Sequence, residues 1–277
     1  MKSKWIGNEI ELNSVDEVFQ ALQKMRLTSS QWVYRGESKE YQNELFPSID
    51  RPPFNQKCDR KTKIAMERQS IELFRSTYKL LATSEESDLL KSDITSLMLM
   101  QHYGTPTRLL DWSYSPYIAA YFAVYSDDGK YEQKGNGHDG FIWGFDYDEY
   151  LKQSDRQWEN HKEMLEKNHM QTYKPAFLEN YEGEWFVCQF LYQIQFPRIL
   201  AQDGLFTFYS QFNVDHAVII QDMLKDAKYF QRYRIQEEDK MAVRKILREK
   251  FNIWHGMIYP DSTGVAVAIK EVLRDNL

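Results

Sequence analysis

Apolar and polar residues recur along the chain with the periods of helices and strands. Residues 14–27 place their apolar side chains on one helical face, and Ser14 with Glu17 forms a capping box that predicts the start of a helix. The same spacing predicts further helices over residues 60–81, 93–103 and 238–250. Short apolar or alternating runs predict strands over residues 32–35, 140–145, 186–195 and 217–221.

These strands and helices do not alternate as regular βαβ units, so the pattern favours the α+β class. The 277 residues contain no clear linker, and we expect a single domain, 1–277, with a helical N-terminal part over about residues 1–30. Residues 146–181 are polar and helix-prone. We interpret them as an insertion or as a lobe that binds a partner.

The segment from Gln101 to Tyr125 combines apolar residues with unusual polar ones. A Gly-Thr-Pro turn leads into an apolar run that carries Arg108 and Asp111. Two residues that are three positions apart in a strand face opposite sides of the sheet, and a buried charge needs a partner. We therefore expect Asp111 to pair with another group, such as Arg35 or Arg198.

The apolar run stops at Ser113, and a helix is predicted to begin directly after it. Ser115 is a typical N-cap residue, and Pro116 is favoured at the first helical position. A strand that ends in polar residues at the start of a helix is a common way to build a ligand site. The sequence therefore predicts a binding site at this junction.

Other residues of interest have plain structural interpretations. Gly36, Gly104 and Gly204 are expected at turns that need a positive φ. His102 lies near the predicted end of a helix, where a contact with the helix terminus or the core is favoured over general-base catalysis. His161, His169 and His216 lack the spacing of metal ligands, so we predict no metal site.

The composition limits the class of protein. The net charge is −6, yet residues 51–68 hold six Lys and Arg against two acids, and residues 225–250 hold nine against five. These segments are either solvated helix faces or patches that bind a polyanion. The sequence has no apolar run of about 20 residues and no signal peptide, and only two cysteines. We therefore expect a cytoplasmic protein with no membrane contact.

Four ordered motifs resemble those of the FRG domain family, over residues from about Trp32 to Val267. The first is the aromatic-Arg-Gly motif Tyr34-Arg35-Gly36, and the second is Q-H-Y-G-T-P-T-R-L-L-D-W-S from Gln101 to Ser113. The third has the form R-I-x-x-Q-x-G-x-F and is present as Arg198, Ile199, Gln202, Gly204 and Phe206. The fourth runs from Gly256 to Pro260-Asp261.

The order of these motifs is also similar to the pattern of ADP-ribosyltransferases, which implies a split β-sheet core with flanking helices. That resemblance implies NAD as a substrate, with no metal, and cleavage of the bond between nicotinamide and ribose. It implies catalytic roles for Arg35, Ser113, Gln202 and Asp203. The predicted NAD-binding residues are Tyr34, Arg35, Gly36, Tyr103, Thr107, Arg108, Trp112 and Tyr121.

One position departs from the ADP-ribosyltransferase pattern. Gln202 stands where a catalytic Glu is expected, and an amide cannot act as a base or neutralise a cation. Asp203, Asp111 or Glu184 would then supply the carboxylate, the enzyme would work without one, or the fold would bind without catalysis.

The resemblance implies a toxin or defence effector, as in toxin–antitoxin or antiviral systems, that transfers ADP-ribose to a macromolecule. The basic segments and the 15% aromatic content favour single-stranded RNA or DNA bases as the acceptor. The alternatives are a hydrolase that depletes NAD and a non-catalytic module that binds a protein or nucleotide. A neutralising antitoxin protein is also expected, and residues 146–181 are its predicted contact.

Overall fold

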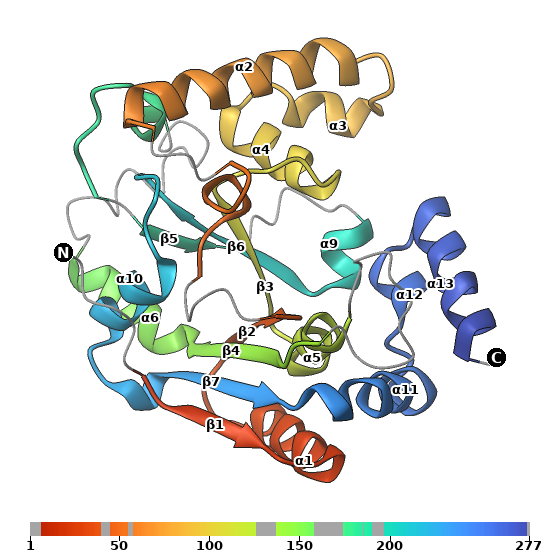
Figure 1. The fold of residues 1–277 in the computed structure, drawn as a ribbon. Helices are drawn as coiled ribbons and strands as arrows, with labels where there is room; N and C mark the ends of the chain where they lie inside the picture. Colours follow the sequence, from red (N-terminus) through yellow and green to blue (C-terminus); the bar gives the residue numbers. More distant parts are fainter. Residues whose placement is uncertain are drawn as a thin grey trace.

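The computed structural model describes residues 7–39, 45–54, 58–125, 137–157, 174–184, 186–189 and 197–275. Seven strands form one mixed sheet in the order β1-β7-β4-β2-β3-β6-β5 (Figure 1). The β1 strand is parallel to β7, and all other neighbouring strands are antiparallel. The strands are β1 (Glu9–Leu12), β2 (Trp32–Glu37), β3 (Leu109–Ser113), β4 (Gly140–Asp146), β5 (Phe186–Gln189), β6 (Gly204–Tyr209) and β7 (Phe230–Ile235).

Helices pack around this sheet, which confirms the predicted α+β class. No helix in the described part of the chain combines the length and apolar character that a membrane span requires. The helices are α1 (Val15–Arg26), α2 (Arg60–Tyr78), α3 (Ser84–Leu89), α4 (Asp93–His102), α5 (Pro116–Val124), α6 (Tyr147–Gln157), α9 (Pro197–Ala201), α10 (His216–Leu224), α11 (Lys240–Phe251), α12 (His255–Ile258) and α13 (Ser262–Asp275).

Alternate residues of the central strands enter different apolar clusters, as expected for a sheet covered on both faces. Tyr34 of β2 packs with residues of α1, α5 and α11, whereas its neighbour Val33 packs with residues of α10. Leu109 of β3 joins a third cluster with α2 and α4, whereas Leu110 joins Val33 on the other face. Side chains of β2 and β3 therefore reach two separate layers.

Most predicted elements are confirmed, including the N-terminal helix. The Ser14 side chain accepts a hydrogen bond from the main chain of Glu17, and the Glu17 carboxylate accepts one from Asn13. Ser115 likewise accepts a hydrogen bond from Ile118, with Pro116 at the start of α5. The predicted capping residues therefore begin both helices.

One predicted strand is wrong. Residues 217–221 belong to the helix α10, whose N-cap Asp215 accepts a hydrogen bond from Ala217. An apolar run of this length is compatible with a strand or with a buried helix, because periodicity alone does not separate them. Of the predicted lobe over residues 146–181, α6 and residues 174–181 are described, and residues 158–173 lie outside the described part.

The central sheet opens between β2 and β3. These strands share a single residue pair, Tyr34 with Ser113, whereas β2 and β4 are paired along six residues. Beyond that pair, the Arg35 Nη1 atom donates a hydrogen bond to the main-chain oxygen of Asp111 at 2.8 Å. The Arg35 side chain thus connects the two strands where their main chains no longer pair.

The predicted role of the glycines is correct at one position and wrong at two. Gly104 has a φ of +82° and ends α4 in a turn. Gly36 and Gly204 lie within the extended strands β2 and β6. At Gly36, an added Cβ atom would lie 1.9 Å from the main-chain oxygen of Ala119 in α5, so the missing side chain allows the helix to pack closely on β2.

Candidate functional site

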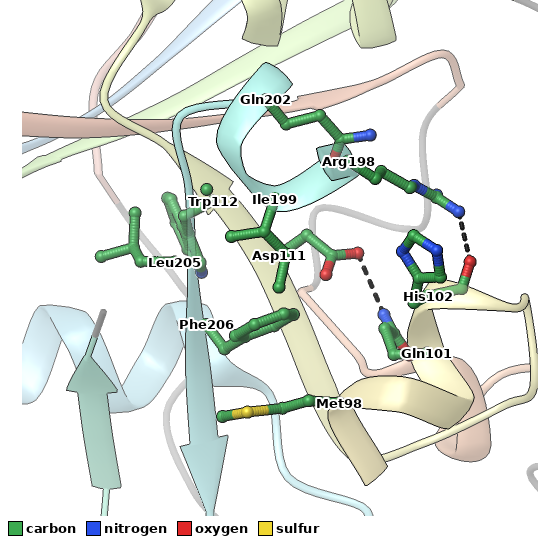
Figure 2. A pocket seen from close by; sticks show the side chains of 11 residues that line it. Met98, Gln101, His102, Asp111, Trp112, Arg198, Ile199, Gln202, Leu205 and Phe206 are labelled. Carbon is green, nitrogen blue, oxygen red and sulfur yellow. Dashed lines mark hydrogen bonds between the residues drawn. The ribbon is translucent and has the colours of Figure 1, made fainter. Parts of the chain in front are cut away.

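The second and third sequence motifs meet at one cleft, which we call the motif cleft. Figure 2 shows it between the C-terminal end of α4, the middle of β3, and α9 with the start of β6. Pairing of β3 with β6 brings these motifs together across about 90 residues of sequence, since Asp111 lies opposite Phe206. The lining residues are Met98, Gln101, His102, Asp111, Trp112, Arg198, Ile199, Gln202, Gly204, Leu205 and Phe206.

The carboxylate of Asp111 is the acidic group of the motif cleft. It points from β3 towards the end of α4, where Gln101 Nε2 donates a hydrogen bond to Asp111 Oδ2 at 3.0 Å (Figure 2). The Thr107 hydroxyl donates to Gln101 Oε1 at 2.6 Å, which fixes the amide so that its NH₂ faces the acid. Asp111 is partly exposed and held in one orientation.

Arg198 and His102 form the wall beside Asp111. Arg198 Nη1 donates a hydrogen bond to the main-chain oxygen of His102, and its guanidinium lies 4.2 Å from the ring centre of Tyr259. Burial, followed by the charge of Arg198, lowers the pKa of His102, so its imidazole is neutral at pH 7. The contact with Arg198 uses the main-chain oxygen of His102, and the predicted role of its imidazole stays a prediction.

The fourth motif joins the same site. Gln202 Nε2 donates a hydrogen bond to the main-chain oxygen of Ile258, and Tyr259 supports Arg198. Because Arg35 of the first motif binds the main chain of Asp111, residues of all four motifs lie in or contact the motif cleft.

Ser113 connects the strand, the helix and α9. Its hydroxyl donates to the main-chain oxygen of Gln202 at 2.7 Å and accepts from the main-chain nitrogen of Ser115 at 3.0 Å. The residue is buried. The structure therefore brings the predicted residues Ser113 and Gln202 together, and in this conformation the hydroxyl positions main-chain segments.

Arg35 lies on the other face of the sheet from the Asp111 carboxylate, because adjacent strand residues alternate in direction. Its Nε atom lies 3.5 Å from Glu37 Oε1, and the same carboxylate oxygen is 2.7 Å from Arg51 Nη2. Trp143 Nε1 donates to the second oxygen of Glu37. Asp111 thus meets Arg35 through its carbonyl group rather than through the predicted ion pair.

Arg108 is placed in the core. It is 1% exposed and donates to both oxygens of Glu67, at 2.8 and 2.5 Å. Burial raises the pKa of Glu67, and the Arg108 guanidinium opposes that shift. Arg108 is therefore held by a buried ion pair, and Thr107, predicted with it to bind NAD, is also buried. Three rings surround the guanidinium at 4.6–4.9 Å: Phe177, Phe208 and Phe212.

The four rings predicted to stack on a ligand differ in exposure. Trp112 is buried and donates to Thr207, and Tyr121 is buried against His255. The Tyr34 hydroxyl donates to the main chain of Met25, although the residue also lines a second pocket. Tyr103 is 52% exposed, directly follows α4, and its hydroxyl contacts Tyr78 and Glu86. Burial within the core keeps Tyr121 from a ligand in this conformation, whereas Trp112 also lines the motif cleft.

Asp203 faces the second pocket, which we call the aromatic pocket. A left-handed backbone, with a φ of +46°, separates it from its neighbour Gln202, which lines the motif cleft. Asp203 is exposed at the pocket wall, and the partial loss of solvent there raises its pKa. The lining residues are Met25, Arg26, Thr28, Ser30, Gln31, Trp32, Tyr34, Tyr114, Ser115, Pro116, Tyr117, Asp203, Phe251 and Ile253.

The two pockets differ in size. The motif cleft has about 20 Å³ that the centre of a water molecule can occupy, whereas the aromatic pocket has about 450 Å³. Ligand pockets for small molecules typically have volumes of about 300–1,000 Å³. In this conformation the motif cleft admits a water-sized group, and a nucleotide needs its side chains to move apart.

Part of the basic segment 51–68 is used for internal contacts. Arg60 donates to main-chain oxygens of Ala176 and Ser210, and Lys63 is paired with Asp50 at 2.8 Å with both groups buried. The segment 225–250 is used in part, since Arg232 pairs with Glu9. These contacts occupy Arg60 and Lys63 of the first segment, whereas Lys61 is exposed.

Among the residues that the structure describes, no three His, Cys, Asp or Glu side chains gather as metal ligands do. Cys188 is buried, which raises the pKa of its thiol, and Cys58 is a free cysteine near the start of α2. Glu184, the third acid considered for catalysis, is exposed outside both pockets.

The fold and the motif cleft define a mixed α+β protein in which four separated sequence motifs meet at one site. The family model of the FRG domain matches residues 30–132. Residues 30–132 therefore carry the FRG domain, which supports the resemblance that the first two motifs indicate. No curated protein and no solved structure matches the chain.

Sequence reasoning did not select Gln101, His102 or Arg198 as site residues. Each belongs to a quoted motif, and that membership is the signal by which they could have been found. Their convergence depends on the pairing of β3 with β6, which spacing alone does not specify.

Proposed function

We propose that the protein is an NAD⁺-dependent ADP-ribosyltransferase-like enzyme whose reaction centre is the motif cleft. The observation that carries the proposal is that residues of all four motifs lie in or contact the motif cleft, which holds the carboxylate of Asp111. The strands that carry Arg35, Ser113 and the residues after Gln202 are neighbours in the sheet, in the order β2-β3-β6. The opening between β2 and β3 supports the split core that this class implies.

The residues fit the chemistry of glycosidic bond cleavage. The bond between C1′ of the ribose and the nicotinamide nitrogen breaks, its electron pair neutralises the ring, and positive charge builds on the sugar. A fixed carboxylate stabilises such a charge electrostatically, and Asp111 is fixed by Gln101. The acceptor forms the new bond at C1′ and loses its proton, which a carboxylate can take.

The cations beside the cleft suit the anionic part of the substrate. Arg198 presents a guanidinium held against Tyr259, and such a group binds phosphate oxygens with defined geometry. Arg35 contributes from the other side of the opening by fixing the main chain of Asp111. Gln202 can orient a ribose hydroxyl but cannot replace the acid, so Asp111 takes the role that the pattern assigns to Glu.

A non-catalytic binding module is the second candidate. The small free volume of the motif cleft and the engagement of Gln202 with Ile258 favour it. The setting of a toxin or defence effector with a neutralising partner stays a prediction for either candidate.

The test is incubation of the purified protein with NAD⁺ labelled in the adenylate phosphate, with total RNA, single-stranded DNA and cellular protein in separate reactions. Asp111→Asn keeps the shape of the side chain and removes its charge. Asp222→Asn, on the exposed surface of α10, is the matched control. We expect transfer of label that is lost in Asp111→Asn and retained in Asp222→Asn.

The other outcomes select between the candidates. Release of nicotinamide without transfer identifies a hydrolase that depletes NAD. No turnover with any acceptor, together with no binding of NAD⁺ by calorimetry, contradicts the proposed enzyme and makes the binding module the better explanation.

A further inference from the structure

We propose that the aromatic pocket binds an unpaired guanine base of a single-stranded nucleic acid and so selects the acceptor. The inference rests on the proposed function in one respect, namely that the neighbouring motif cleft is the reaction centre. It concerns a separate pocket, and its binding properties can be measured without NAD⁺.

The walls of the aromatic pocket suit a planar ring. Trp32 and Tyr114, which are partly exposed, and Phe251, which is 38% exposed, line it, and its free volume of about 450 Å³ is of ligand size. Phe251 stacks on Tyr117 with ring centres 4.6 Å apart and on Phe19 with ring centres 5.5 Å apart, which holds it at the end of α11 with 38% of the residue exposed. Stacking on aromatic rings is the main way in which proteins bind unpaired bases.

Asp203 gives the pocket a preference among bases. Within the described part of the chain, its carboxylate has no hydrogen bond or ion pair, and its left-handed backbone turns it away from the motif cleft. A carboxylate accepts two hydrogen bonds at once, and guanine presents two adjacent donors, N1–H and N2–H, on its Watson–Crick edge. Adenine, cytosine and uracil lack that pair of donors.

The rim of the pocket suits a phosphate backbone. Two helices end beside it, with Lys24 and Arg26 in the last turn of α1 and Arg248 and Lys250 in the last turn of α11. These α11 residues are the end of the basic segment 225–250 and directly precede Phe251, which lines the pocket. Cations in such positions attract a polyanion without reading its sequence.

A second hollow extends the aromatic pocket along the surface. It shares Arg26, Tyr117 and Phe251 with the pocket and continues over α1 as far as Asp16, with a volume of about 630 Å³. The two together form a groove that crosses the exposed ring of Phe251, which provides room for more than one nucleotide. The surface therefore fits a nucleic-acid strand better than a free nucleotide.

The aromatic pocket lies beside the motif cleft, where the acceptor of ADP-ribose has to be placed. Gln202 lines the motif cleft and Asp203 lines the aromatic pocket, so adjacent residues border both. Ser113 holds the main chain of Gln202 from β3, which fixes the segment between the pockets. A base held in the aromatic pocket is thus placed next to the proposed reaction centre.

The test uses the full chain without NAD⁺ and fluorescein-labelled octamers of uridine that contain one guanosine, inosine or adenosine. Inosine keeps N1–H and lacks the 2-amino group. From the worth of a bidentate contact, we expect the guanosine octamer to bind about tenfold more tightly than the inosine octamer by fluorescence anisotropy. Deoxyribose octamers of the same sequences show whether RNA or DNA is the source of the base.

Two variants separate base selection from stacking. Asp203→Asn keeps a residue that tolerates the left-handed backbone, and we expect it to lose the preference for guanosine over inosine. Phe251→Ala is expected to weaken the binding of all octamers by on the order of tenfold, because a stacking surface is lost. Asp222→Asn should behave as the wild type, and circular dichroism verifies that each variant is folded.

Several results would overturn the inference. The first is equal binding of the guanosine and inosine octamers by the wild type, and the second is an unchanged guanosine preference in Asp203→Asn. The third is binding of an arginine-rich peptide that is tighter than binding of the octamers and is abolished in Asp203→Asn. The octamers can fail these binding tests while the wild type turns over NAD⁺ and Asp111→Asn does not. That combination rejects the base site and leaves the proposed enzyme intact. Guanosine-selective binding without NAD⁺ turnover supports the base site and rejects the proposed enzyme.

Discussion

Arg108 and Asp111 lie three residues apart in the same motif and have separate partners in separate environments. Arg108 donates to both carboxylate oxygens of Glu67 in the core, whereas the Asp111 carboxylate accepts a hydrogen bond from Gln101 in the motif cleft. The motif therefore combines a residue that stabilises the fold with one that faces a candidate reaction centre, and the two roles can be tested separately.

Arg108→Met should destabilise the protein with no direct effect on the motif cleft. Removal of one partner from a buried ion pair leaves the charge of Glu67 uncompensated, which costs about 3–5 kcal/mol. We expect that loss in the free energy of unfolding measured with urea. Asp111→Asn is the control and should change this free energy by less than about 1 kcal/mol, because an amide oxygen still accepts from Gln101. Near-native stability of Arg108→Met, together with weakened ligand binding, would assign Arg108 to the ligand.

Arg35→Ala should lower NAD⁺ turnover by about 100-fold or more and leave the protein folded. The substitution removes the hydrogen bond to the main chain of Asp111, so the acid loses its support across the opening of the sheet. Arg51→Ala is the matched control, because Arg51 binds the same Glu37 carboxylate. Steady-state rates of nicotinamide release measure both variants. Equal rates for the two variants would show that Arg35 acts only through Glu37.

His216 should make the protein less stable at acid pH. Burial, and then the charges of Arg35 and Arg51, lower its pKa from 6.5 to about 3 in the folded state. Its stabilising contribution is complete above pH 6.5 and is lost as the pH falls towards 3, because the unfolded chain takes up a proton that the folded chain does not. His216→Gln should reduce the slope of unfolding free energy against pH in this window by up to about 1.4 kcal/mol per pH unit.

Urea titrations at pH 7, 6, 5 and 4 measure that slope. The control is His138→Gln, since His138 is an exposed histidine, and it should follow the wild type. An unchanged slope in His216→Gln would mean that other groups cause the acid sensitivity.

Local patterns in the sequence identified the elements and motifs well, because their causes are local. Ser14 and Ser115 accept hydrogen bonds from residues three positions later, so their helices could be predicted from neighbouring residues. The helix at residues 217–221 was predicted as a strand, because a short buried run has no distinctive period.

The site was harder to predict because its parts are joined by the sheet. The cleft depends on the pairing of Asp111 with Phe206 and on the opening beyond Tyr34 and Ser113. No spacing within the sequence specifies either. Arg108 illustrates the same limit, since its partner Glu67 lies 41 residues away on α2 and its burial follows from that packing.

Asp203→Asn provides a last prediction, on stability rather than binding. Partial loss of solvent raises the pKa of this carboxyl in the folded state, so the folded chain holds its proton more tightly than the unfolded chain does. The resulting contribution to stability is present at acid pH and is lost as the pH rises through the carboxyl range. At pH 7 the ionised carboxylate of Asp203 therefore slightly destabilises the fold, and Asp203→Asn should raise the melting temperature by a small amount.

The sign of that change in stability distinguishes a binding role of Asp203 from a structural one. Since the side chain is exposed at the pocket wall, the gain should be well below 1 kcal/mol at pH 7 and should vanish near pH 3. Calorimetry of Asp203→Asn and Asp222→Asn at both values measures it against a control that should not change. A gain in stability together with a lost guanosine preference is typical of a binding residue kept at some expense to the fold. A loss of stability at pH 7 would instead show that the acid supports the turn before β6.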